Sequence, residues 1–355
     1  MMAGPSGSAP PLPPQGCCCL STPFSVPAYG QAVAVAAGVF WVRMPLPFAL
    51  DHINLWLLED DDGWAVVDTG VSDQRTRDLW QGVFQDTLAG RPVTRVICTH
   101  FHPDHMGLAA WMQRRFGATF QAPLPEWLYG RMLSLDTGDG FVEASLAFYR
   151  AAGFDADLLE LVRRRGNAYA ARTRHIPPTC RAIRPDQALS IGGRNWVMMP
   201  GYGHSPQMGC LYCADLGILI SGDQILPHIS PNVSVWPNEP DADPLALFLA
   251  SLQDFRRLPA DSLVLPSHGT PFRHLHQRID DLADHHRQRL EECLTACRQP
   301  QTARQILAVL FDRPLDDHQL FFAIGESLAH LHYLLGQGKI SRTFDQDGTA
   351  LFAAV

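Results

Sequence analysis

The sequence is poor in lysine and has no excess of positive charge. Only one of its 28 basic residues is a lysine, Lys339, and the formal net charge is −8 at pH 7. A protein that binds a phosphate backbone uses an excess of Lys and Arg to release counterions. The composition therefore argues against nucleic acid, and against DNA in particular, as the partner of this chain.

Long apolar runs are also missing. A membrane-spanning helix requires about 18 or more consecutive apolar residues, and the nearest candidate, residues 32–42, is much shorter. With 46% hydrophobic and 18% charged residues among 355, the chain has the composition of a globular protein with more than one hydrophobic core. We therefore expect no membrane association.

The cysteines lack the regular spacing of a disulfide framework. Cys98, Cys180, Cys210 and Cys213 are scattered among apolar runs, which favours a reducing, cytoplasmic compartment. Cys210 and Cys213 have the spacing of a zinc ribbon, but no second pair matches them. We therefore interpret these two as packing residues.

The N-terminal segment has the composition of a disordered leader. Residues 1–16 are rich in Pro, Gly and Ser, carry no positively charged side chain and precede no apolar segment of the signal-peptide type. We assign residues 1–33 to this leader. For Cys17, Cys18 and Cys19, a role in targeting or lipidation is the alternative.

Residues 34–275 alternate between strand-like and helical patterns, which predicts an α/β domain. The acidic turn at 60–63 lies between two β-rich runs and predicts a hairpin. Strands are expected at 38–43, 53–59, 64–68, 93–98, 189–191, 196–199, 210–213, 218–221 and 263–265, and helices at about 72–88, 106–116 and 244–257. Residues 124–176, which are helical and loop-like, are interpreted as an insertion.

The pattern changes again after residue 275. A charged helix at about 275–297 leads to a capping box, Thr302 with Gln305, that opens a helix ending near residue 311. A further helix at about 317–335 and a hairpin at 340–353 follow. Two helices and a hairpin of this size are typical of a winged-helix module. We therefore assign residues 276–355 to a C-terminal helix and a winged-helix-like domain.

Histidine is abundant, with fifteen residues, and imidazole is the commonest metal ligand in proteins. His100, His102, Asp104 and His105 fall within six residues, directly after the predicted buried strand 93–98. Alternation along an extended segment puts His100 and His102 on one side, so both can bind one metal. Asp104 and His105 follow a turn and point to a neighbouring position. The segment therefore predicts two metal ions side by side.

This segment resembles the His-x-His-x-Asp-His signature of the metallo-β-lactamase-fold hydrolases. Further motifs extend the resemblance over about residues 35–272, in the order that the family uses: Asp68-Thr69-Gly70, residues 200–206 with His204, Ser221-Gly222-Asp223, and Pro266-Ser267-His268-Gly269. The resemblance implies an α/β fold, an αββα sandwich to which the insertion and the winged-helix-like module are added. It implies two ligand sets bridged by Asp223 and supported by Asp68: His100, His102 and His204 for one metal, and Asp104, His105 and His268 for the other.

By this resemblance the chain binds two divalent metal ions. Zinc is the expected metal, although His and carboxylate ligands also suit iron and manganese. A metal-bound hydroxide would attack the carbonyl of a thioester, ester or lactone, and Asp104 would be the catalytic residue that accepts or relays a proton. Glyoxalase II and the β-lactamase-like protein 2 group are similar. However, Met106 stands where glyoxalase II has a Gly pair, and no glutathione-binding pattern is visible, so we expect another small-molecule acyl substrate.

Four other functions are weighed against this one. A ribonuclease or phosphodiesterase is the main alternative, but nucleases of this fold often carry a large domain between the later ligands. The intervals of 19 residues from His204 to Asp223 and 45 from there to His268 leave no room for it. A non-catalytic scaffold would lack ligands, and a β-lactamase would normally carry an export signal. A DNA reader is opposed by 7 Lys/Arg against 11 Asp/Glu within residues 279–355.

Other residues have two or more interpretations. His52, Tyr202 and His228 are candidates for substrate contact or for packing. Arg163 to Arg165 are either solvated or select an anionic substrate. The apolar side chains of helix 317–335 exceed what one small domain face needs, so this helix is expected to be a lid, a substrate wall or a homodimer contact. The remaining histidines are expected to be solvated (His274, His276, His285 and His286) or to lie at the surface or in packing (His330 and His332).

Overall fold

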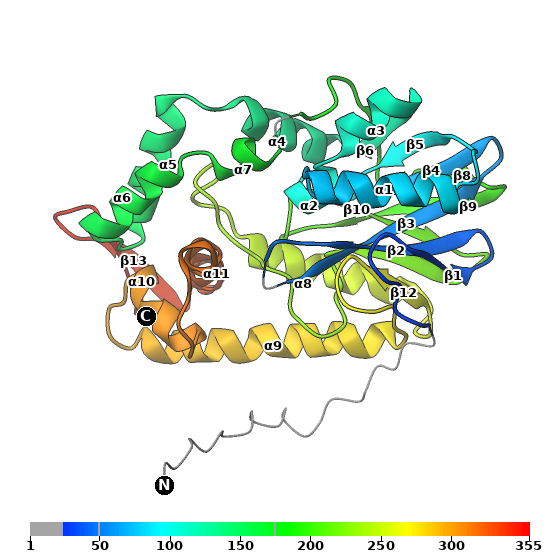
Figure 1. The fold of residues 1–355 in the computed structure, drawn as a ribbon. Helices are drawn as coiled ribbons and strands as arrows, with labels where there is room; N and C mark the ends of the chain where they lie inside the picture. The colour runs from blue at the N-terminus through cyan, green and yellow to red at the C-terminus, as the bar shows by residue number, and fades with distance from the viewer. Residues whose placement is uncertain (1–23, 49, 174) are drawn as a thin grey trace, which may run out of the picture.

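The computed structural model describes residues 24–48, 50–173 and 175–355. Two β-sheets pack face to face, in the right half of the view in Figure 1. The first sheet has seven strands, in the order β1 (Ala32–Ala36), β2 (Val39–Pro45), β3 (His52–Asp60), β4 (Gly63–Val67), β5 (Val93–Ile97), β6 (Thr119–Pro123) and β7 (Arg181–Ile183). The second has five, in the order β12 (Leu263–Pro266), β11 (Ile218–Gly222), β10 (Met208–Cys213), β9 (Arg194–Gly201) and β8 (Ala188–Ile191).

Strand direction brings the predicted motifs together. β1 to β4 are antiparallel, and the acidic turn between Asp60 and Gly63 closes the predicted β3–β4 hairpin. β4 and β5 are parallel, as are β11 and β12, and β9 is two antiparallel steps from β11. Parallel strands end at one edge of a sheet. The motifs that follow these strands therefore lie at the same edge of the two sheets.

Helices cover the outer face of each sheet. On the first sheet lie α1 (Gln74–Asp86), α2 (Pro103–Met106) and α3 (Ala109–Phe116), with Trp80 and Met112 in the core beneath them. On the second lie α8 (Pro244–Asp254), the 3-10 turn Phe255–Arg257 and α9 (Leu275–Ala296). Figure 1 shows α1 to α3 above the sheets and α8 and α9 below. The predicted αββα sandwich is confirmed.

The space between the sheets is filled by large apolar side chains from both. Trp41 and Trp56 of the first sheet are fully buried, and their rings stack with centroids 6.2 Å apart. Met198 and Leu211 of the second sheet belong to the same buried cluster. Burying a large apolar side chain contributes about 2 to 3 kcal/mol to the stability of the fold. This layer therefore holds the two sheets, and the predicted ligands at the ends of their strands, in place relative to each other.

Four helices form the segment between β6 and β7: α4 (Leu124–Leu135), α5 (Asp139–Ala151), α6 (Ala156–Arg165) and α7 (Ala168–Arg172). Asp155 caps α6 by accepting from the backbone N of Leu158, and Asn167 caps α7 in the same way. Tyr149 of this segment packs edge to face on Phe321, with ring centroids 5.2 Å apart. The segment therefore reaches the C-terminal unit.

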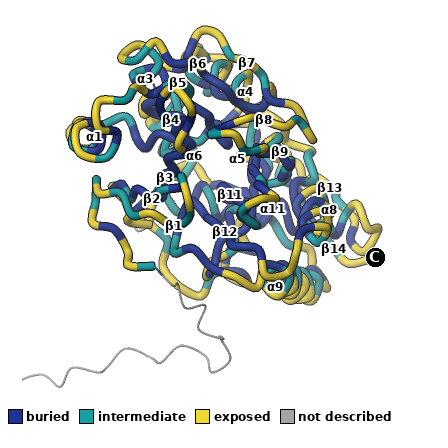
Figure 2. The backbone as a smooth tube through the Cα atoms, turned by 90° about the vertical axis from the view of Figure 1, so that its right-hand side faces the viewer, coloured by how far each residue is buried: buried dark blue, intermediate teal, exposed yellow. Residues whose placement is uncertain are grey.

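The C-terminal unit contains α10 (Ala303–Leu310), α11 (Asp317–Gly336) and the hairpin of β13 (Ile340–Phe344) and β14 (Ala350–Ala354). The capping box of Thr302 and Gln305 is present, as predicted. Most apolar side chains of α11, such as those of Ile324 and Leu331, are buried within the chain. Figure 2 shows by colour how far each residue along the backbone is buried. The buried side chains of α11 are therefore not available for a homodimer contact. That the chain forms a homodimer, and that its C-terminal unit is a winged-helix module, both stay predictions.

Several expectations need correction. β1, β6 and β7 were not predicted. The leader was drawn too long, because Phe24 packs against the core between the sheets and β1 begins at Ala32; the rest of the predicted leader, with Cys17 to Cys19, lies outside the described residues. His286, expected to be solvated, is fully buried. Among the described residues, no helix is both long and apolar enough to cross a membrane.

Candidate metal centre

The first predicted ligand set comes together after β5 and β9. Nε2 of His100 and Nδ1 of His102 are 2.9 Å apart, and Nε2 of His204, 102 residues further along the chain, lies 3.0 Å from the same atom of His102. These ring nitrogens all lie within 4.8 Å of one another. Three imidazole nitrogens around one point form a set that could hold a divalent metal ion.

Asp104, His105 and His268 form a second group within the same limit of 4.8 Å. Oδ2 of Asp104 is 3.6 Å from Nε2 of His105 and 3.5 Å from Nε2 of His268. Asp223 lies between the groups: its Oδ2 is 3.4 Å from Nε2 of both His204 and His268, and its Oδ1 is 3.6 Å from Nε2 of His105. A carboxylate that contacts both sets has the position of a bridge between two cations.

Hydrogen bonds behind two of the rings leave Nε2 directed to the centre. Nδ1 of His204 donates to the carbonyl of Asn232 at 2.7 Å. Nδ1 of His268 donates to the carbonyl of His52 at 2.8 Å. In a neutral ring the other nitrogen then carries the lone pair that a metal ligand needs. Both rings are therefore prepared for a cation.

Two polar atoms at the centre lack partners. Nε2 of His105 and Oδ1 of Asp223 are buried and form no hydrogen bond within the described chain. A buried polar atom without a partner is rare because its desolvation is not compensated. A divalent cation between the two groups would compensate both atoms, so the residues present fit the metal ions that the fold implies.

Asp68, directly after β4, holds His105 from behind. Its Oδ2 accepts from Nδ1 of His105 at 2.8 Å, and its two oxygens accept from the backbone N and Oγ1 of Thr99, each at 2.8 Å. A carboxylate in this position fixes the ring and increases the basicity of the far nitrogen. Asp68 has a backbone φ of 60°, in the left-handed region that Asp tolerates better than most residues.

The two ligand sets differ in their electrostatic surroundings. Burial lowers the pKa of His100 and His102 well below the usual histidine value, so both rings are neutral at pH 7. Burial acts in the same direction on His105, but the neighbouring carboxylates, foremost Asp104, outweigh it and raise the pKa of His105 to about 10. The second set therefore lies in a negative environment that favours a cation.

One residue that sequence reasoning missed, Glu126 of α4, joins the two loops of the first set. Its Oε2 accepts from the backbone N of Phe101 at 3.0 Å, and its Oε1 accepts from Oγ of Ser205 at 2.8 Å and from the backbone N of Gln207 at 2.5 Å. Phe101 and Ser205 each adjoin a histidine of the set. Burial raises the pKa of Glu126 to about 7. The only sequence signal was a lone carboxylate in an apolar run.

The loop of His268 is held by residues of β3. Nδ2 of Asn54 donates to the carbonyls of Pro266 and Gly269, each at 2.9 Å. Nε2 of His52 accepts from the backbone N of Gly269 at 2.9 Å. Both side chains are buried. His52, a candidate for substrate contact, therefore lies behind the ligand loop, and its contacts are those of a positioning residue.

The other two substrate candidates are Tyr202 and His228, and neither side chain is hydrogen-bonded to a predicted ligand within the described residues. The hydroxyl of Tyr202 accepts from Nε2 of Gln207 at 3.1 Å. His228 is exposed. Neither lines the cavity described next, and a substrate contact for either one stays a prediction.

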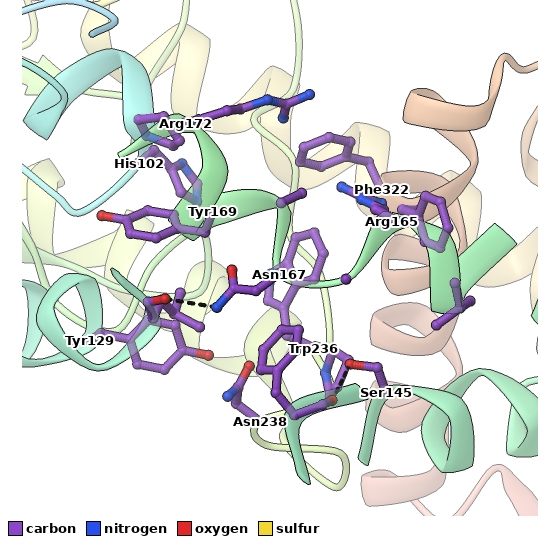
Figure 3. Close-up of a pocket in the computed structure, with 18 of the residues that line it drawn as sticks. His102, Tyr129, Ser145, Arg165, Asn167, Tyr169, Arg172, Trp236, Asn238 and Phe322 are labelled. Atoms are coloured by element: carbon purple, nitrogen blue, oxygen red, sulfur yellow. Dashed lines mark hydrogen bonds between the residues drawn. The ribbon is translucent and has the colours of Figure 1, made fainter. Parts of the chain in front are cut away.

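A cavity of about 160 Å³ opens beside His102 (Figure 3). Aromatic side chains from the insertion, the loop after β11 and α11 form much of its wall: Tyr129, Tyr149, Tyr169, Trp236, Phe321 and Phe322. The hydroxyl of Tyr169 donates to the carbonyl of Phe101 at 2.7 Å, which ties the wall to the ligand loop. α11 thus contributes to the wall of the cavity, and its role as a substrate wall stays a prediction.

Comparison with known families agrees with this geometry. The sequence model of the metallo-beta-lactamase superfamily matches residues 49–268. The chain belongs to this superfamily. Metallo-beta-lactamase-fold proteins are mostly hydrolases and generally bind divalent metals, usually zinc. A second model, the metallo-beta-lactamase-like C-terminal domain, matches residues 290–355, so the C-terminal unit also occurs in other proteins of this superfamily.

Two solved structures of the superfamily resemble nearly the whole chain. A beta-lactamase domain protein from Burkholderia ambifaria is 42% identical, with a TM-score of 0.88, covering 93% of this chain and 96% of that one. A metallo-beta-lactamase family protein from Thermus thermophilus is 28% identical, with a TM-score of 0.77, covering 91% of this chain and 100% of that one.

The curated relatives are more distant. The acyl-coenzyme A thioesterase MBLAC2 of Homo sapiens is 23% identical over 194 residues, or 53% of this chain. The matched region spans 63% of the length of that relative. The MBLAC2 of Bos taurus is 24% identical over 195 residues, again 53% of this chain and 63% of that protein.

Proposed function

We propose that the chain is a metal-dependent hydrolase of a thioester, ester or lactone. The observation that carries the proposal is the cavity that begins at His102 and is walled by aromatic rings. Apolar pockets with a few convergent polar groups are typical of small-molecule sites, and this one suits the acyl part of a substrate whose carbonyl lies at the ligands. The distant relatives named acyl-coenzyme A thioesterase support the same substrate class.

When bound, two divalent ions, for which zinc is our first choice before iron and manganese, would supply Lewis acidity and lower the pKa of a water molecule. The residues of the chain do the rest. Asp104, whose side chain is 19% exposed, accepts the proton of the attacking water at a carboxylate oxygen and returns it to the leaving sulfur or oxygen. Tyr169 and Trp236 enclose the acyl part and exclude water from it.

The proposal assigns His100, His102 and His204 to one metal, and Asp104, His105 and His268 to the other, with Asp223 between them. We also propose that the partner is a small molecule and that the protein is located in the cytoplasm. The ribonuclease or phosphodiesterase and the non-catalytic scaffold have no observation in their favour and enter as outcomes of the test.

Metal analysis combined with a hydrolysis panel tests the proposal. The panel holds thioesters, lactones, phosphodiesters and a cephalosporin, each assayed with metal-loaded, chelated and reloaded protein. We expect two metal equivalents and cleavage of thioesters or lactones that chelation abolishes. Cleavage of phosphodiesters alone would show a phosphodiesterase, and bound metal without any cleavage would show a scaffold; either result contradicts the proposal.

Variants locate the chemistry. His102→Ala and Asp104→Ala should each lose about one metal equivalent and most of the activity, while the melting curve stays cooperative. His228→Ala, at an exposed position that follows Asp223 in the sequence, is the matched control and should keep both metals. Full activity in a folded, metal-depleted variant would refute the assignment.

A further inference from the structure

The cavity wall carries positive charge without negative charge. Arg165, the last residue of α6, and Arg172, the last residue of α7, line it, whereas no Asp or Glu is found among the described residues of the wall. The whole chain, in contrast, has a net charge of −8. In Figure 3, His102 and Tyr169 lie at the left, Arg165 lies at the right, and Asn167 lies between them.

Arg165 has no polar partner within the described chain. Its guanidinium lies over the ring of Phe321, 3.9 Å from the centroid, but it makes no hydrogen bond or ion pair there. Its side chain is only partly exposed, and burial lowers its pKa. A guanidinium has five N–H donors, and a partly buried cation without an anion is unfavourable. An anion bound to the guanidinium of Arg165 would therefore be favourable at this position.

The neighbouring arginines do not share this situation. Arg172 is exposed, donates to Nε2 of His318 at 3.1 Å and lies over the ring of Phe48. Arg163 pairs with Glu160 at 3.5 Å on the outer side of α6. Arg164 is exposed and does not line the cavity. Arg165 is thus the one arginine of this helix end that combines a place in the wall with unused donors.

We propose that Arg165 binds an anionic group of the substrate, so that the site selects acyl compounds with a negative charge separated from the scissile carbonyl by an apolar segment. This inference rests on the proposed function for the position of the carbonyl beside His102. A guanidinium pairs well with carboxylate, sulfonate and phosphate oxygens. The anion has two possible sources, the far end of the acyl group or the leaving group, and the experiments separate them.

A binding experiment tests the inference without catalysis. Calorimetric titration compares 4-phenylbutyrate with its uncharged counterpart 4-phenylbutanol, against wild type, Arg165→Gln, Arg165→Lys and the control Arg164→Gln. We expect Arg165→Gln to weaken phenylbutyrate binding about tenfold, which corresponds to about 1.4 kcal/mol, and to leave phenylbutanol unchanged. Arg165→Lys should keep most of the affinity, and Arg164→Gln all of it. An equal loss for both compounds, or no loss for either, overturns the inference.

Kinetics identify the source of the charge. The N-acetylcysteamine thioesters of glutarate and pentanoate differ by one acyl carboxylate. The coenzyme A and N-acetylcysteamine thioesters of pentanoate have the same acyl group but different leaving groups, of which only coenzyme A carries phosphates. Arg165→Gln should raise KM about tenfold for the charged member of one pair, with kcat nearly unchanged. If wild type cleaves none of these compounds, the thioesterase form of the proposed function is wrong, and the titration alone decides the inference. If it cleaves them and KM never changes selectively, the inference is wrong although the function stands.

Discussion

Glu126 is a carboxylate that joins the two loops of the first predicted ligand set without belonging to that set. Its carboxylate accepts three hydrogen bonds, two from backbone N–H groups and one from a hydroxyl. An ionised carboxylate can accept at both oxygens, whereas a glutamine amide turns one acceptor into a donor. In Glu126→Gln, either the backbone N of Phe101 or the donors of Ser205 and Gln207 would face an NH₂ group.

We therefore expect Glu126→Gln to lower metal affinity by about tenfold or more, as is usual when groups that orient ligands are changed. Competition with a chromogenic chelator measures the affinity. Glu143→Gln, an exposed glutamate of α5, is the control and should bind metal as wild type does. Equal affinity of Glu126→Gln and Glu143→Gln would show that Glu126 does not position the loops.

The difference between predictable and unpredictable residues has a physical basis here. The motif around His100 is visible in the sequence because its members are neighbours along one strand and one turn. Glu126 and Asn54 act on backbone groups that lie 25 to 81 and 212 to 215 residues away. Which carbonyl or N–H faces a side chain depends on sheet register and loop path, and neither is readable from local spacing.

At the scale of elements, α11 shows where pattern reading failed. Its length was predicted, but its apolar side chains were interpreted as more than one small domain face needs. A helix that is apolar on all sides is buried, and here α8, α9, α10 and the insertion cover it. The missed strands have a similar cause: β7 has three residues, and its pairing with β6, rather than its own composition, makes it a strand.

Gly325 sets how closely α11 approaches the loop after β11. A Cβ at this position would lie 2.8 Å from the carbonyl oxygen of Val235 and 2.8 Å from Cβ of Ser234, and the carbonyl of Gly325 accepts from the backbone N of Val235. Because the next residue, Trp236, lines the cavity, this contact links helix packing to the shape of the site.

Gly325→Ala should therefore destabilise the fold by about 1 to 3 kcal/mol through overpacking, despite the roughly 1 kcal/mol by which Ala favours a helix over Gly. Gly336→Ala, in the last position of the same helix, meets only a side-chain oxygen of Asp243 at 3.3 Å and should be neutral or stabilising. Urea unfolding of both variants measures the difference. Equal free energies of unfolding for Gly325→Ala and Gly336→Ala would contradict the close approach of α11 to the loop after β11.

At the scale of the whole molecule, a buried histidine pair joins three distant parts of the chain. Nδ1 of His286 in α9 is 3.2 Å from Nε2 of His330 in α11, and Nε2 of His286 is 3.1 Å from Oγ of Ser230. Nδ1 of His330 donates to the carbonyl of Glu326 at 2.8 Å. Both rings are fully buried, and burial lowers the pKa of His330 to about 4 and that of His286 to about 2.

The depressed pKa of His330 predicts a loss of stability in acid. Between about pH 6.5 and 4 the unfolded chain binds a proton that the folded chain does not, so the free energy of unfolding decreases as the pH falls. At 1.36 kcal/mol per pH unit, wild type should lose about 2 kcal/mol between pH 6.5 and 5 relative to His330→Gln. Urea unfolding at both pH values measures this difference. His274→Asn, at an exposed position just before α9, should lose stability with pH as wild type does. If the free energy of unfolding decreased equally with pH in wild type and in His330→Gln, the prediction would be contradicted.

The bonds from Asn54 to Pro266 and Gly269 have a consequence for biosynthesis. They connect residues 212 and 215 positions apart, so the last ligand loop can dock on β3 only when both ends of this span are present. A chain growing on the ribosome therefore cannot close the loop of His268 until Gly269 has been synthesised. Contacts of such long range form late in folding. The predicted ligand set that contains His268 is therefore completed later during synthesis than the predicted set that ends with His204.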